Sequence, residues 1–200
     1  AGDSLICYTS EMNGNDIQLI VYPNDYLVTP GLSDSYTGDF NGDGIDEILA
    51  IGSSSTSIHS FTLNKTWTIY LPGNNIRITD VNGDSKPDLI IFESEGYEVY
   101  EFFYDGAADT FSLGLLADGS NRHLTSSTFN RIVDGDFNGD GNSDFLVRDS
   151  TAWSIMLSTG KLFENSEIEA PLSPLFDPFI PNPDKSLYVR DINNDNKSDI

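Results

Sequence analysis

Asp136-Phe-Asn-Gly-Asp-Gly-Asn-Ser-Asp144, followed at once by the apolar run Phe145-Leu-Val147, decides the fold of this chain. Nearly the same nine residues recur at 39–47, 80–88 and 191–199, so we number four segments, loop 1 to loop 4, in chain order. Each loop carries side-chain oxygens at positions 1, 3, 5 and 9. This spacing, with a backbone carbonyl available at position 7, is typical of a loop that binds a hard, oxygen-seeking cation such as Ca²⁺.

The loops therefore predict up to four calcium sites. Positions 1, 3, 5 and 9 supply side-chain ligands and position 7 supplies its carbonyl oxygen. The expected ligands are Asp39, Asn41, Asp43, Ile45 and Glu47 in loop 1; Asp80, Asn82, Asp84, Lys86 and Asp88 in loop 2; Asp136, Asn138, Asp140, Asn142 and Asp144 in loop 3; Asp191, Asn193, Asp195, Lys197 and Asp199 in loop 4.

Position 6 must turn the chain back toward the cation. Gly44 and Gly141 adopt a left-handed backbone without steric cost. Asn196 is the next most tolerant residue and Ser85 is a poorer one. We therefore expect loops 1 and 3 to bind most strongly, and loop 2 to be weak or strained.

The residues after each loop predict β-strands. The runs at 48–51, 89–92 and 145–147 are short, apolar and rich in branched or aromatic residues, which is typical of buried strands. An EF-hand loop has twelve residues and lies between helices, so these loops are not EF-hands.

Further strands are expected around each buried run. A strand should precede each loop, at 35–37, 76–79, 131–133 and 187–190. Alternating apolar residues predict a second strand after each run, through Ile17, Leu19 and Val21; His59, Phe61 and Leu63; Tyr97 and Val99; Trp153, Ile155 and Leu157. A third strand is expected at 68–71. The N-terminal segment 3–8 has the form of a position 9 acid followed by a buried strand.

The repeat predicts an all-β fold made of β-propeller blades. Position 9 falls at residues 47, 88, 144 and 199, at intervals of 41, 56 and 55, which suit one blade of about four antiparallel strands. The repeats run approximately over 3–46, 47–87, 88–143 and 144–198. Because the chain begins just after one loop and stops just after another, we expect a fragment of a larger propeller. A complete four-bladed ring is the alternative.

The Asp-x-Asn-Gly-Asp-Gly-x-x-Asp loop between two strands resembles the FG-GAP/VCBS repeat family, which includes the propeller of integrin α subunits. The resemblance covers essentially the whole chain and implies a seven-bladed parent propeller with calcium in its loops. The phrase Trp153-Ser-Ile-Met-Leu-Ser-Thr-Gly160 is similar to bacterial versions, including those of toxin-complex B and Rhs-type shells. The chain lacks the Phe-Gly and Gly-Ala-Pro pairs of the integrin repeats, which disfavours an integrin.

The acidic composition argues against nucleic acid and anionic membranes as partners. The formal charge of −22 comes from 32 acidic and 10 basic residues, and such a charge repels nucleic acid and anionic membranes. No apolar run approaches the ~18 residues of a membrane span. Cys7 is the only cysteine, so no internal disulfide can form. Loops of this kind suit an extracellular or cell-surface setting, where calcium is abundant.

The sequence favours a non-catalytic protein. Neither His59 nor His123 lies in a recognisable nucleophile motif. We expect a calcium-stabilised binding or adhesion module that meets a protein or glycan. The alternative is a structural propeller segment of a toxin-complex or Rhs-type shell. The proline-rich segment 171–183 is interpreted as a stiff connection between blades in preference to a binding epitope.

Overall fold

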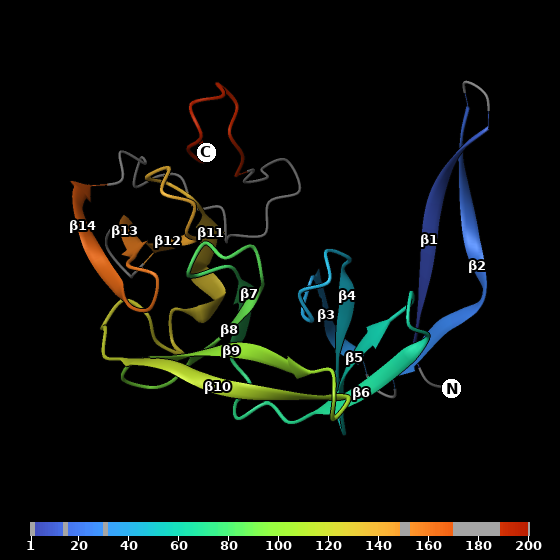
Figure 1. The fold of residues 1–200 in the computed structure, drawn as a ribbon. Coiled ribbons are helices and arrows are strands. Elements are labelled where there is room, and N and C mark those ends of the chain that lie inside the picture. Colours follow the sequence, from blue (N-terminus) through green and yellow to red (C-terminus); the bar gives the residue numbers. More distant parts are fainter. Residues whose placement is uncertain (1–2, 14–15, 30–31, 149–152, 170–188, 200) are drawn as a thin grey trace. The chain divides into compact units, whose positions relative to one another are not determined.

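The computed structural model describes residues 3–13, 16–29, 32–148, 153–169 and 189–199 (Figure 1). They form an all-β structure, as predicted, with three four-stranded antiparallel sheets and one two-stranded hairpin. In each four-stranded sheet the strands follow one another in chain order. Three meandering antiparallel sheets are consistent with propeller-like blades.

The chain divides into two compact units. The first comprises Ala1–Leu71 and Tyr104–Ser112, and the second comprises Pro72–Phe103 and Leu113–Ile200. The first unit contains the hairpin of β1 (Asp3–Asn13) and β2 (Asp16–Thr29). It also contains a sheet formed by β3 (Leu32–Gly38), β4 (Glu47–Gly52), β5 (Thr56–Ser60) and β6 (Lys65–Ile69).

The other two sheets belong mainly to the second unit. One consists of β7 (Ile76–Thr79), β8 (Asp88–Phe92), β9 (Tyr97–Asp105) and β10 (Thr110–Gly119). The other consists of β11 (Ile132–Gly135), β12 (Asp144–Arg148), β13 (Trp153–Ser158) and β14 (Phe163–Glu169). A short 3₁₀ helix, Phe129–Arg131, immediately precedes β11. No helix among the described residues is both long and apolar enough to span a bilayer.

Loops 1 to 3 each connect the first and second strands of a sheet. The last residue of the first strand pairs with position 9 of the loop, as Thr79 does with Asp88 and Gly135 with Asp144. The second strand then continues from position 9 into the sheet's buried interior. All five residues of β8 are buried, which confirms the predicted buried strand there.

Some predicted strands were misplaced. β5 ends at Ser60, and Phe61 and Leu63 lie in a turn. That turn includes Asn64 at φ 49° and places β6 at Lys65–Ile69 rather than at 68–71. The prediction for β13 was right in position and wrong in alternation. Its buried residues are Trp153, Met156 and Ser158, whereas Ile155 and Leu157 are only partly buried.

Loop 4 has a simpler setting. Within the described residues, an isolated antiparallel bridge joins its flanks, Arg190 and Asp199. The strand predicted at 187–190 lies partly outside the described residues. The proline-rich segment 171–183 lies wholly outside them.

The second unit has a core shared by its two sheets. Phe92 lies 6.0 Å from Phe145, measured between ring centroids, and Phe145 stacks on Phe163 at 4.5 Å. The N–H of Phe163 donates to the Tyr97 hydroxyl at 2.7 Å across the same interface. Val81, at position 2 of loop 2, is fully buried in this core. The hydrophobic effect thus holds the start of loop 2 in the core through Val81, while positions 3 to 7 stay at the surface.

Candidate metal-binding loops

A single hydrogen-bond scheme organises all four loops. The position 1 carboxylate accepts bonds from the N–H groups of positions 4, 5 and 6. In loop 3 those three N–H groups lie 2.7, 3.2 and 2.9 Å from the oxygens of Asp136. The same three bonds form at Asp39, Asp80 and Asp191. One side chain therefore holds the entire turn.

Positions 3 and 5 continue the scheme. The amide oxygen at position 3 accepts the N–H of position 5, and the carboxylate at position 5 accepts the N–H of position 7. In loop 3 these bonds measure 2.8 Å at Asn138 and 2.8 Å at Asp140. Loops 1, 2 and 4 repeat them within 2.8–3.0 Å. The repeated residue types thus produce repeated geometry.

The position 9 carboxylate joins the end of the loop to its beginning. Asp88, Asp144 and Asp199 each accept the N–H of position 2, at 2.9, 2.9 and 3.0 Å. Loop 1 differs because Glu47 is one methylene longer and accepts the N–H of position 3, Asn41, at 3.3 Å. The position 2 N–H of loop 1, from Phe40, bonds to the Gly38 carbonyl instead.

The backbone at position 6 is left-handed in every loop, as predicted. The φ angles are 87° at Gly44, 66° at Ser85, 90° at Gly141 and 64° at Asn196. Ser85 therefore occupies a conformation that costs an L-residue energy. Position 4 is also left-handed in all four loops, at φ 60–82°. The sequence reasoning missed this second turn, although the Asn-Gly pair at positions 3 and 4 is a signal for it.

Loops 1 to 3 each place several carboxylates close together, and this excess of negative charge affects the pKa of the position 9 residue. Burial raises the pKa of the Glu47 carboxyl to about 7, and the nearby Asp43 and Asp39 carboxylates add to the rise. Burial likewise raises the pKa of Asp88 to about 7 and that of Asp144 to about 6. In each case the position 5 and position 1 carboxylates of the same loop contribute. A cation placed in the loop would relieve both effects.

The donor set fits a hard cation. Among the described residues, no three Asp, Glu, His or Cys side chains are grouped as a metal site by themselves. The expected set is mixed, however, and includes an amide oxygen at position 3 and a carbonyl oxygen at position 7 in addition to the carboxylates. Hard cations such as Ca²⁺ take oxygen ligands of all three kinds. The residues present therefore supply suitable atoms and a net negative charge.

Loop 2 has an extra carboxylate that sequence spacing did not reveal. Glu101 on β9 pairs in register with Asp88, and its carboxylate accepts a 3.3 Å bond from the Asn82 amide. A small pocket of about 100 Å³ beside the loop is lined by Asp84, Lys86, Pro87, Asp88, Glu101, Phe102 and Phe103. Cross-strand pairing brings Glu101 here, and this could not be deduced from loop spacing.

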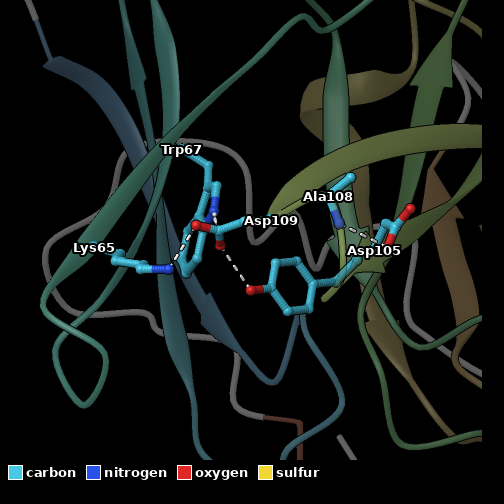
Figure 2. A network of polar contacts seen from close by, with 6 residues as sticks. Lys65, Trp67, Asp105, Ala108 and Asp109 are labelled. Atoms are coloured by element: carbon cyan, nitrogen blue, oxygen red, sulfur yellow. Dashed lines mark hydrogen bonds and ion pairs between the residues drawn. The ribbon is translucent and has the colours of Figure 1, made fainter.

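A second polar cluster lies in the first unit and centres on Asp109 (Figure 2). Its carboxylate accepts bonds from Trp67 Nε1 at 3.1 Å and from the Tyr104 hydroxyl at 2.9 Å, and forms a 2.5 Å ion pair with Lys65. The Trp67, Tyr104 and Phe111 rings pack on one another beside it. Every polar group of the cluster has a partner within the cluster. The arrangement is that of a structural clasp.

Comparison with models of protein families and with curated proteins finds no match for the chain.

Proposed function

We propose that this chain is a calcium-stabilised, non-catalytic binding or adhesion module of a secreted or cell-surface protein, built from repeats of the FG-GAP/VCBS type. The observation that carries the proposal is the recurrence of one hydrogen-bond scheme in four loops of matching oxygen donors. Such recurrence is what a repeated requirement for the same ligand would select.

Calcium would serve stability in this proposal. Each loop gathers carboxylates at positions 1, 5 and 9, and their mutual repulsion opposes folding unless a cation or solvent compensates it. A cation that binds only the folded loops stabilises them by mass action. Asp136 and Asp144 hold the two ends of loop 3, and Asp140 reaches its middle. These three residues would fix the cation, with no chemical step required.

Isothermal titration with Ca²⁺ tests the proposal directly. After treatment with a chelator, the protein should bind several calcium ions, up to four, and bind Mg²⁺ much more weakly, because Mg²⁺ demands stricter octahedral geometry. Asp43→Ala should remove one site and leave the others. Absence of any calcium-dependent heat would overturn the proposal.

The binding role requires a separate test. Retention of the purified protein on a glycan array and on immobilised extracellular proteins should depend on calcium and be lost with chelator. Calcium-dependent stability without any such retention would favour the alternative, a structural propeller segment of a toxin-complex or Rhs-type shell.

A further inference from the structure

We propose that loops 2, 3 and 4 bind their cations cooperatively, because backbone hydrogen-bond relays join an expected ligand of loop 3 to one of loop 2 and an expected ligand of loop 4 to one of loop 3. The inference rests on the proposed calcium binding. It goes further by assigning which sites are coupled, through which atoms, and which site is independent.

The first relay runs from loop 3 to loop 2. The carbonyl of Asn142, the expected position 7 ligand, belongs to the same peptide unit as the N–H of Ser143. That N–H donates a 2.7 Å bond to the carbonyl of Asp80. The carbonyl of Asp80 and the N–H of Val81 belong to one peptide unit. That N–H donates a 2.9 Å bond to the carboxylate of Asp88, the expected position 9 ligand of loop 2.

The second relay repeats the first between loops 4 and 3. The N–H of Ser198, in one peptide unit with the Lys197 carbonyl, donates a 2.6 Å bond to the carbonyl of Asp136. The next N–H, from Phe137, donates at 2.9 Å to the carboxylate of Asp144. The same two steps thus join position 7 of one loop to position 9 of the preceding loop.

The relay has a definite electronic direction. A cation on the position 7 carbonyl draws electron density from a delocalised peptide unit and makes its N–H a stronger donor. The effect passes through the next peptide unit, because hydrogen bonds in series polarise one another. It ends in a stronger hydrogen bond to the position 9 carboxylate, which holds that expected ligand in its place in the loop. By linkage, occupation of the preceding loop favours the following one equally.

The loops also touch directly. A Cβ atom built at Gly83 would lie 2.8 Å from Asn142 Oδ1, and one at Gly139 would lie 3.2 Å from the Asn196 carbonyl oxygen. Position 4 of loop 2 therefore lies against position 7 of loop 3, and position 4 of loop 3 lies against position 6 of loop 4. When a cation orders one loop, the conformations available to the neighbouring loop are restricted. The second cation then has less disorder to remove, which adds to positive cooperativity.

Loop 1 lacks both ends of such a relay. Position 8 of loop 2 is Pro87, which has no N–H to donate. In loop 1 itself, the Phe40 N–H bonds to Gly38, and Glu47 accepts from Asn41 instead. We therefore expect loop 1 to bind independently, which makes it an internal control.

One electrostatic effect opposes the relay. Each bound cation lowers the negative charge that attracts the next one, and this effect weakens with ionic strength while short hydrogen bonds are little affected. Titrations at physiological salt and at about 1 M salt separate the two. Coupling carried by the relay should persist or increase at the higher salt concentration.

Residue-resolved NMR tests the proposal. The position 6 amides of Gly44, Ser85, Gly141 and Asn196 each report on their own loop during a titration with Ca²⁺. In Asp140→Ala, which removes a ligand of loop 3, the midpoints of loops 2 and 4 should rise about fivefold or more, the usual size of such coupling. The midpoint of loop 1 should not move. Unchanged midpoints in loops 2 and 4 would overturn the proposal.

A matched pair of variants isolates the N–H group. Ser143→Pro removes the donor, and proline already occupies this position at Pro87 in loop 2. Ser143→Ala keeps the N–H and loses only the 2.7 Å hydroxyl contact with Thr79. The proline variant should uncouple loop 2 from loop 3, and the alanine variant should not. Equal effects of the two would contradict the relay.

Ser198→Pro and Ser198→Ala provide the same comparison for loops 3 and 4, should Ser143→Pro fail to fold. A different failure is equally recognisable. If none of the four amides responds to Ca²⁺ in the unmodified protein, the proposed calcium binding itself is wrong.

Discussion

The backbone N–H of Ser143 donates a 2.7 Å hydrogen bond to the carbonyl oxygen of Asp80, from position 8 of one loop to position 1 of the loop before it. Ser198 makes the equivalent bond to Asp136 at 2.6 Å. Loops 2, 3 and 4 are therefore a connected series within the second unit of the chain. Their stability and their proposed cation binding should show that connection.

Calcium should raise the melting temperature strongly. A ligand bound only by the folded state stabilises it by ~2.7 kcal/mol per site at 100 times its dissociation constant. Thermal melting followed by circular dichroism, in excess Ca²⁺ and in excess chelator, measures the difference. Identical curves would show that the loops hold no stabilising cation.

Loops 1 and 3 should contribute more calcium-dependent stability than loop 2. Asp43→Ala and Asp140→Ala each remove the position 5 carboxylate from a loop whose turn residue is glycine. Asp84→Ala removes it from the loop with Ser85 at φ 66°. Melting of the three variants in excess Ca²⁺ should show the smallest loss for Asp84→Ala. Equal losses would mean that the turn residue does not influence binding.

The turn residue can be tested alone. Ser85→Gly should stabilise the protein by about 1 kcal/mol, because a left-handed L-residue costs roughly that amount. Gly141→Ser should destabilise it similarly. A Cβ atom at Gly141 would meet nothing within 4 Å, so backbone strain is isolated there. Chemical denaturation in chelator provides both values, and two changes of the same sign would contradict the strain argument.

The metal-free protein should lose stability as the pH rises. The pKa values of Glu47 and Asp88 are raised to about 7 and that of Asp144 to about 6, above ordinary values of 4.5 for Glu and 3.8 for Asp. The folded chain then holds protons that the unfolded chain releases. This stabilisation is fully present below the ordinary values and is lost as the pH rises through about 6 to 7.

Melting in chelator between about pH 5 and pH 8 measures this trend. In excess Ca²⁺ the trend should reverse, because protons compete with the cation for the same carboxylates. Asp144→Asn is the control, since it removes one titrating group and should reduce the slope in chelator. A rise in stability with pH in chelator would contradict the prediction.

Asp109→Ala should loosen the clasp in the first unit. It removes the acceptor for Trp67 and Tyr104 and the partner of Lys65, at a residue whose φ is 56°. The fluorescence of Trp67, measured in a Trp153→Phe background, should shift to longer wavelength as the indole gains water.

Asp109→Asn is the matched control for the clasp. It keeps an oxygen acceptor and a residue type that tolerates positive φ, so it should shift the fluorescence less. Hydrogen bonds from Lys65, Tyr104 and Trp67 lower the pKa of Asp109. The clasp's contribution should therefore persist above the ordinary carboxyl pKa and disappear as the pH falls through the lowered value.

Several features follow from local sequence and were predicted correctly. The buried strands after loops 1 to 3 correspond to short apolar runs in the sequence. Such runs are buried in the interior once a sheet forms. The left-handed turn at position 6 follows from Gly44 and Gly141. The internal hydrogen bonds of each loop, such as the one that the Asn142 N–H donates to Asp140, were not predicted, although they too join residues close in the chain. Local chemistry suffices for interactions of this kind.

Other features depend on contacts between distant residues. The turn at Asn64 moved the predicted third strand, and burial in β13 falls on Met156 in place of Ile155 and Leu157, since tertiary packing outweighs a weak alternation.

The sequence alone thus determined the four loops and their oxygen-bearing side chains, because each loop depends on residues within nine positions of one another. Its apolar runs and their repetition along the chain likewise indicated the all-β class. Only the tertiary structure decided that Glu101 faces loop 2 and that Asp109 meets Trp67. It likewise decided that Ser143 donates to Asp80, far away along the chain. The physical reason is that a backbone N–H is the same in every residue except proline, so its partner is set by how the sheets pack and not by side-chain identity.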